Sequence, residues 1–110
     1  MTGFAVVFLL VLAGTCAGTA VPSRWLPRWL PNDKLLHAAA YCALSLLALA
    51  GLGLTTADWL PVGLGLFALG LLLECVQIAV PGRGFSLGDV AANTAGIAGG
   101  LTLHALAASL

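Results

Sequence analysis

The sequence predicts an all-α polytopic membrane protein, a compact bundle of four transmembrane helices in a single domain over residues 1–110. Hydrophobic residues make up 61% of the chain and charged residues only 7%, whereas soluble domains contain about 25% charged residues. A water-soluble chain this short exposes much of its surface, and eight charged side chains do not cover it. A bilayer removes this difficulty because lipid solvates the apolar surface.

Four apolar segments are long enough to cross a bilayer, which requires about 20 mostly apolar residues per helix. Helices are expected because a backbone in lipid must satisfy its own hydrogen bonds, and because these segments are rich in Leu and Ala without alternating polarity. The predicted spans are residues 4–21, 34–54, 59–80 and 87–108.

The first segment also has features of a secretory signal. Its apolar run leads into Cys16-Ala17-Gly18-Thr19-Ala20, which resembles a small-residue cleavage site. However, no Lys or Arg precedes the run, and the run is long for a signal. We therefore predict a retained membrane span, with cleavage of residues 1–20 as the open alternative.

The later connections carry turn signals. Residues 55–58 predict a tight hairpin between the second and third spans. In residues 81–86, Pro and two Gly residues break the helix on either side of Arg83. Ser86 and Asp89, three residues apart, fit a capping box at the start of the fourth helix.

Polar residues gather at three helix ends. In four consecutive crossings, the start of the second helix, the end of the third and the start of the fourth lie at the same membrane face. Spacings of three, four or seven residues keep the polar residues of each helix on one side. These residues are Asp33, Lys34, His37 and Tyr41, then Glu74 and Gln77, then Asp89 and Asn93, with Arg83 in the turn.

The depth of this cluster favours a polar pocket open to one membrane face. Tyr41, Glu74 and Asn93 lie about seven residues from a predicted helix end, which is about 10 Å at about 1.5 Å per residue. Charged groups at such depth persist when they face the bundle interior. The candidate catalytic residues are Glu74 and His37, and the candidate binding residues are Asp33, Lys34, Tyr41, Gln77, Arg83, Asp89 and Asn93. The competing interpretation is interhelical hydrogen bonding, worth about 0.6–2 kcal/mol per bond.

Other features exclude several classes of function. The three cysteines, Cys16, Cys42 and Cys75, lie in apolar runs without paired spacing, so they predict neither a disulfide framework nor a metal site. No metal-ligand spacing is recognised, and no cofactor is expected. The net charge is zero and no basic run exists, so nothing indicates nucleic-acid binding or docking on anionic lipid.

The fourth helix carries Gly88, Ala92, Gly96 and Gly100 at intervals of four. Such a ridge of small residues permits another helix to approach closely. The partner is either a helix of the same chain or a second copy in a homodimer, and the sequence leaves both open.

The polar residues resemble, in order and spacing, the VanZ-like family of small bacterial membrane proteins. The resemblance covers residues 32–100, and Cys75 occupies a position that is more often aliphatic. It implies an integral protein of the bacterial plasma (inner) membrane. The family's namesake is associated with resistance to the glycopeptide antibiotic teicoplanin, but the resemblance supplies no reaction. The matching motifs are Asp33-Lys34-Leu35-Leu36-His37 with Tyr41, Glu74-Cys75-Val76-Gln77, Pro81-Gly82-Arg83, Ser86-Leu87-Gly88-Asp89 and Asn93-Thr94-Ala95-Gly96.

The first functional hypothesis is a site that binds or acts on a membrane lipid or a lipid-linked headgroup of the envelope. Lys34, His37 and Arg83 offer cations and hydrogen-bond donors suited to phosphate. Glu74 or His37 would serve as a general base, and Asp89 would orient Arg83 or His37. No nucleophile motif supports catalysis, so whether the chain is an enzyme stays open, and binding alone accounts for the same residues.

Two alternatives remain. One is a small proton-coupled exporter that uses Glu74, although an exporter would place a lone acid nearer the midplane. The other is a structural or accessory membrane subunit in which the polar cluster fastens helices together.

The side of the membrane is also open. Counting Arg24, Arg28, Lys34 and Arg83 places the polar face in the cytoplasm. A role against an extracellular antibiotic fits the opposite orientation.

Overall fold

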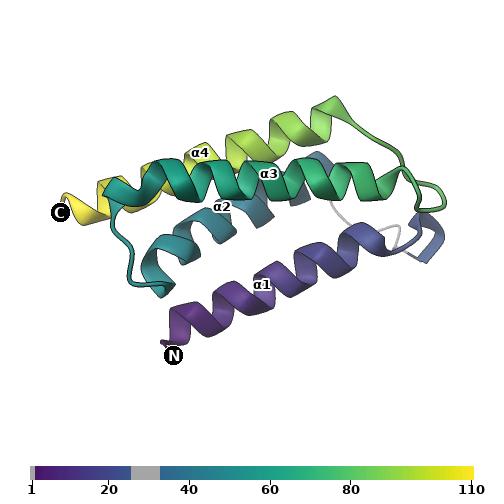
Figure 1. The fold of residues 1–110 in the computed structure, drawn as a ribbon. Coiled ribbons are helices and arrows are strands. Elements are labelled where there is room, and N and C mark those ends of the chain that lie inside the picture. The colour runs from purple at the N-terminus through teal and green to yellow at the C-terminus, as the bar shows by residue number, and fades with distance from the viewer. Residues whose placement is uncertain (1, 26–32) are drawn as a thin grey trace.

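The computed structural model describes residues 2–25 and 33–110, apart from the side chains of Ser23 and Asp33. Within these residues the chain folds into four α-helices that form one bundle, so the predicted fold class is confirmed (Figure 1). The elements are α1 (Gly3–Ala20), η1 (Ser23–Trp25), α2 (Asp33–Gly51), η2 (Thr56–Asp58), α3 (Trp59–Gln77) and α4 (Leu87–Ala108), where η marks a short 3-10 helix.

The helices have the length and surface of membrane spans. In the described part of the chain, all four are long and apolar enough to cross a bilayer. Large apolar side chains point outward from them, including Leu10 at 66% exposure, Leu64 at 60% and Leu72 at 61%. Exposed apolar surface on this scale is unfavourable in water and favourable in lipid. This is the architecture of a multi-pass membrane protein.

The four helices alternate in direction (Figure 1). The N- and C-termini lie at one end of the bundle, and the turn between α3 and α4 lies at the other end, near η1. The start of α2, the end of α3 and the start of α4 therefore meet at the same end, where the sequence places most of the polar residues.

The central helix is α2, which contacts α1, α3 and α4. Its contact with α4 is close because Gly96 lies against the carbonyl oxygen of Ala38, and Gly100 lies against Ser45 and Cys42. A Cβ atom at either glycine would collide with these atoms. The small-residue ridge thus packs inside the bundle, whereas homodimerisation through the same residues stays a prediction.

Two helix ends differ from the sequence prediction. α2 ends at Gly51 rather than at residue 54, and Gly53 follows with a φ of 70°, a left-handed conformation that favours glycine. α3 ends at Gln77 rather than at residue 80, since residues 78–80 form tight turns before the proline. Glu74 is therefore three residues, about 5 Å, from the end of its helix, rather than the about seven residues that the sequence predicts.

The start of α4 has one of the two hydrogen bonds of the predicted capping box. The hydroxyl of Ser86 accepts a hydrogen bond from the backbone N–H of Asp89 at 3.2 Å. This satisfies one of the N–H groups that a helix leaves unpaired in its first turn. The carboxylate of Asp89 turns toward α2, which makes it part of the polar cluster.

Candidate functional site

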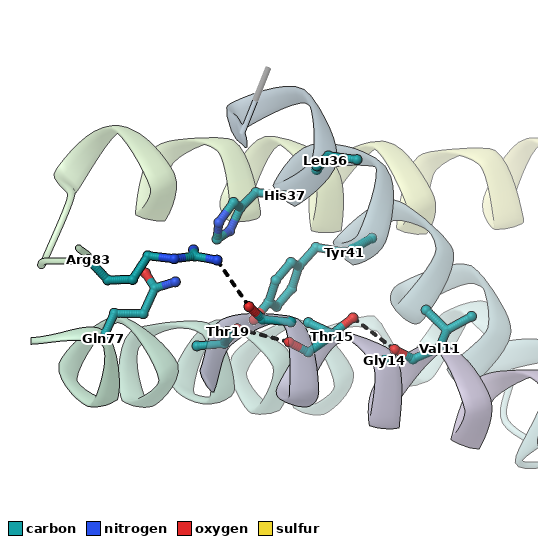
Figure 2. A pocket seen from close by; sticks show the side chains of 11 residues that line it. Val11, Gly14, Thr15, Thr19, Leu36, His37, Tyr41, Gln77 and Arg83 are labelled. Carbon is teal, nitrogen blue, oxygen red and sulfur yellow. Dashed lines mark hydrogen bonds between the residues drawn. The ribbon is translucent and has the colours of Figure 1, made fainter. Parts of the chain in front are cut away.

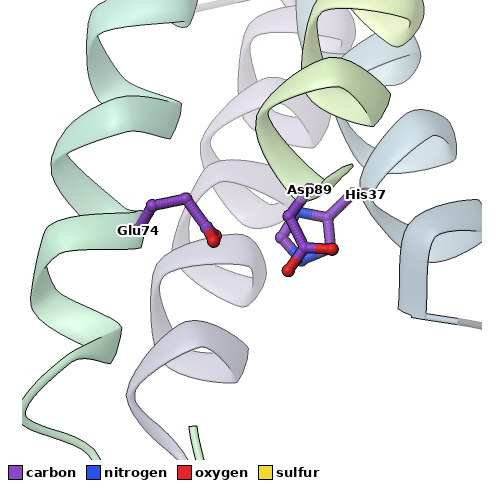
Figure 3. A group of neighbouring side chains, drawn as sticks. All are labelled: His37, Glu74 and Asp89. Atoms are coloured by element: carbon purple, nitrogen blue, oxygen red, sulfur yellow. The ribbon is translucent and has the colours of Figure 1, made fainter. Parts of the chain in front are cut away.

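Three helices bring a histidine and two carboxylates together. Figure 3 shows Glu74 pointing from α3 toward Asp89 of α4 and His37 of α2. One side-chain ligand atom from each residue lies within 4.8 Å of the other two. The carboxylate residues are buried, with exposures of 1% for Glu74 and 4% for Asp89. This group has the donor types of a metal site, although its members are far apart in the sequence.

His37 contacts two polar side chains of α4. Its Nδ1 lies 2.7 Å from Oδ1 of Asn93, a hydrogen bond between α2 and α4. Its Nε2 lies 3.6 Å from Oδ2 of Asp89. An amide oxygen only accepts hydrogen bonds, so this pairing assigns the ring proton to Nδ1. The Nε2 atom is the one that faces Asp89.

Glu74 connects the end of α3 to the start of α4. Its Oε1 accepts a hydrogen bond from the backbone N–H of Ser86 at 3.0 Å. With the Gln77 amide oriented to satisfy both neighbours, its nitrogen donates to Oε2 of Glu74 at 3.0 Å. In the same orientation, the amide oxygen of Gln77 accepts from Nη1 of Arg83 at 2.8 Å. The buried acid is therefore linked to the turn arginine through one amide.

Asp89 forms an ion pair with Lys34. The Nζ atom of Lys34 lies 3.6 Å from Oδ1 of Asp89, and the lysine side chain is 57% exposed. In the described part of the chain, Oδ1 of Asp89 is buried without a hydrogen-bond partner.

Arg83 reaches into a cavity of about 350 Å³ between α1, α2 and α3 (Figure 2). Arg83 lies in the turn between α3 and α4, and its Nη2 donates a hydrogen bond to the carbonyl oxygen of Gly18 in α1 at 3.2 Å. Its Nε is buried and has no hydrogen-bond partner among the described residues. The cavity is lined by Val11, Gly14, Thr15, Gly18, Thr19, Leu36, His37, Ala40, Tyr41, Gln77 and Arg83.

The cavity is polar at one end and apolar at the other. Figure 2 shows His37, Gln77 and Arg83 gathered at one end, with Val11 toward the other. Tyr41 is 1% exposed and packs in the core with Leu44 as well as lining the cavity. The arrangement suits an amphipathic ligand, one with an anionic head and an apolar chain.

The structure brings most of the predicted site residues together. One set comprises Lys34, His37, Asp89 and Asn93, and a second comprises Glu74, Gln77 and Arg83. The two sets meet where the ligand atoms of His37, Glu74 and Asp89 lie within 4.8 Å of one another. Tyr41 lines the cavity, and the side chain of Asp33 lies outside the described structure, as does Arg28, one of the predicted topology signals. The roles of the site residues in catalysis or binding stay predictions.

Sequence reasoning missed the contribution of α1. Gly14, Thr15, Gly18 and Thr19 line the cavity. The hydroxyls of Thr15 and Thr19 bond to backbone carbonyls one turn earlier, at 2.8 and 2.9 Å, so their small side chains stay compatible with an apolar span. The repeat of Gly-Thr at an interval of four residues is the signal that marks this helix face.

Comparison with known proteins adds no relative. No family model, curated protein or solved structure matches the chain. The resemblance to the VanZ-like family therefore rests on the motifs alone.

Proposed function

We propose that the cavity binds the phosphate-bearing headgroup of a membrane lipid or of a lipid-linked envelope molecule. The observation that carries this proposal is Arg83, whose buried Nε lacks a hydrogen-bond partner among the described residues. A guanidinium group binds phosphate oxygens through charge-assisted hydrogen bonds. A phosphate oxygen would give this N–H the acceptor that burial otherwise denies it.

The remainder of the cavity supports an amphipathic ligand. Ligand pockets range from about 300 to 1,000 Å³, and a volume of about 350 Å³ suits a headgroup and the first part of its chain. Val11, Leu36 and Ala40 provide an apolar wall. A lipid would enter sideways from the bilayer with its phosphate directed toward the polar end.

The resemblance to the VanZ-like family supports a more specific setting. In this proposal the chain lies in the bacterial plasma (inner) membrane and contributes to resistance against glycopeptides of the teicoplanin type. His37 and Glu74 remain the candidates for acid or base chemistry on the bound headgroup. Binding alone accounts for the same residues, so no reaction is assigned.

The test measures binding of defined lipids to the purified protein in detergent by native mass spectrometry. The probes are undecaprenyl phosphate, phosphatidylglycerol and, as the zwitterionic control, phosphatidylcholine. We expect Arg83→Gln to weaken binding of the anionic probe at least about tenfold, because a hydrogen bond to a charged group contributes about 1.5–3 kcal/mol. A preference for undecaprenyl phosphate indicates a lipid-linked envelope ligand, and a preference for phosphatidylglycerol indicates a bulk phospholipid.

Arg24→Gln is the matched control because Arg24 is exposed in η1 and lies outside the cavity. It removes the same charge and should leave lipid binding unchanged. Equal affinities of wild type and Arg83→Gln for both anionic probes contradict the proposal.

A structural role is the second candidate, since the same contacts also fasten helices. The His37–Asn93 bond joins α2 to α4, and the bond from Ser86 to Glu74 closes the turn between α3 and α4. A proton-coupled exporter is less favoured, because Glu74 lies near a helix end and accepts hydrogen bonds from Ser86 and Gln77.

A further inference from the structure

We propose that His37, Glu74 and Asp89 form a binding site for a divalent transition-metal ion, with Zn²⁺ as the first candidate. Each residue comes from a different helix, and their ligand atoms lie within 4.8 Å of one another (Figure 3). The headgroup proposal shares His37, which also lines the cavity, but it rests on Arg83, whereas this inference rests on the three ligand atoms.

The distance between the first two ligands fits a metal better than a hydrogen bond. Zn²⁺ binds imidazole nitrogen and carboxylate oxygen at about 2.0–2.2 Å, so two ligands of a tetrahedral ion are about 3.3–3.6 Å apart. Nε2 of His37 and Oδ2 of Asp89 are 3.6 Å apart. A hydrogen bond between such atoms measures about 2.7–3.2 Å.

The orientation of His37 is the one that metal-binding histidines adopt. Such a histidine donates its second ring N–H to an oxygen of the protein, which fixes the tautomer and aims the other nitrogen at the ion. Here Nδ1 meets Oδ1 of Asn93 at 2.7 Å, and Nε2 is the nitrogen that faces Asp89. Nε2 and the carboxylate of Asp89 are thus placed as two ligands of one cation.

Asp89 provides a second, independent indication. Its side chain is only 6% exposed. Among the described residues, no hydrogen-bond donor reaches its buried Oδ1, and the exposed Lys34 lies 3.6 Å away. Burial of a carboxylate oxygen without a donor is unfavourable, whereas a cation held by both oxygens of this carboxylate would satisfy Oδ1 together with Oδ2. Imidazole nitrogen and carboxylate oxygen are also both ligands that Zn²⁺ accepts in proteins.

The test is a metal titration of the full chain, with any purification tag removed, in non-ionic detergent after chelator treatment. Co²⁺ replaces Zn²⁺ as the probe because its visible absorption reports the geometry of its ligands. We expect one equivalent of Co²⁺ to bind per chain and to be displaced by Zn²⁺. No phosphate lipid is added, so the result does not depend on the headgroup proposal.

The variants separate ligands from neighbouring residues. His37→Ala and Asp89→Asn should lose at least about tenfold in metal affinity, and Asn93→Ala, which removes a positioning residue, about 10- to 100-fold. His104→Ala is the control, because His104 pairs with Thr56 at 2.8 Å near the opposite end of the bundle. The proposal is overturned if His37→Ala and His104→Ala bind the metal with equal affinity. It is also overturned if the wild type binds neither Co²⁺ nor Zn²⁺.

X-ray absorption of the Zn²⁺-loaded wild type decides the question if a variant fails to fold. One imidazole with oxygen ligands is the expected coordination. Sulfur scattering overturns the proposal, because it would place the ion at Cys16, Cys42 or Cys75, which are free thiols.

Discussion

Glu74 is the residue whose substitution best separates a structural role of the polar cluster from a functional one. Its carboxylate accepts hydrogen bonds from Ser86 and, through the oriented amide, from Gln77. An amide at this position would keep an acceptor oxygen for Ser86, and Gln77 would turn its own amide to pair with the new nitrogen, which removes the acceptor that Gln77 offers Arg83. The charge, however, would be lost. A fastener tolerates this change, whereas binding that depends on the charge does not.

We therefore predict that Glu74→Gln folds and inserts but loses function. Stability should fall by about 1 kcal/mol, the net contribution of a hydrogen bond, as measured by thermal unfolding in detergent. In bacteria challenged with teicoplanin, cells that make wild type should grow at higher antibiotic concentrations than cells that make Glu74→Gln at matched membrane levels.

Cys75→Ala serves as the control, because Cys75 is the next residue on α3 and its side chain is exposed. It should protect as well as wild type. Equal protection by Glu74→Gln would support the structural interpretation of the cluster.

Individual residues were predictable to the extent that spacing along a helix decides them. The intervals between His37 and Tyr41, or between Glu74 and Gln77, put each pair on one helix face, and the structure keeps them there. Spacing does not reveal which residues pair across helices. The bond between His37 and Asn93 and the approach of three ligand atoms depend on helix rotation and tilt, which no local pattern encodes.

At the scale of elements, the contact between α2 and α4 depends on glycines. Gly96 lies against the backbone of Ala38. A Cβ atom added to Gly96 would be 3.0 Å from the backbone nitrogen of Cys42. Backbone atoms cannot move aside as a flexible side chain can. A methyl group here would therefore push the two helices apart, and with them His37 and Asn93, which bond across the same interface.

We predict that Gly96→Ala lowers the stability of the bundle by about 1–3 kcal/mol, the usual cost of overpacking. Thermal unfolding in detergent measures the change. Gly99→Ala is the matched control, because an added Cβ there meets no atom within 4 Å. It should be neutral or stabilising by up to about 1 kcal/mol, since alanine favours helix over glycine. A loss of stability in both variants would attribute the effect to α4 itself rather than to its packing.

Helix ends were less predictable than helix cores. Hydropathy follows composition, and the apolar residues 78–80 continue the third span without interruption. The structure instead turns at these residues, because the proline at position 81 and Gly82, with a φ of 76°, take the chain out of the helix. Beyond this turn, the backbone N–H of Ser86 returns to donate a hydrogen bond to Glu74.

At the scale of the whole molecule, the four crossings separate the two ends of the bundle. Both termini lie at one end, and the turn that carries Arg83 lies at the other (Figure 1). The number and length of the apolar runs made this arrangement predictable. The face toward which the polar end opens was not predictable, because Lys34 and Arg83 are both topology signals and candidate site residues.

The arrangement predicts that the turn between α3 and α4 and the end of α4 lie on opposite sides of the membrane. Single cysteines introduced by Gly84→Cys and Ser109→Cys, in a background without the three native cysteines, report these two places. Both positions are exposed. A membrane-impermeant maleimide should label one of them in intact cells or sealed spheroplasts and the other only after permeabilisation. Labelling of Gly84→Cys in intact cells would show that the polar end opens to the outside, and labelling of Ser109→Cys would show that it opens to the cytoplasm. Labelling of both positions in intact cells would contradict four crossings.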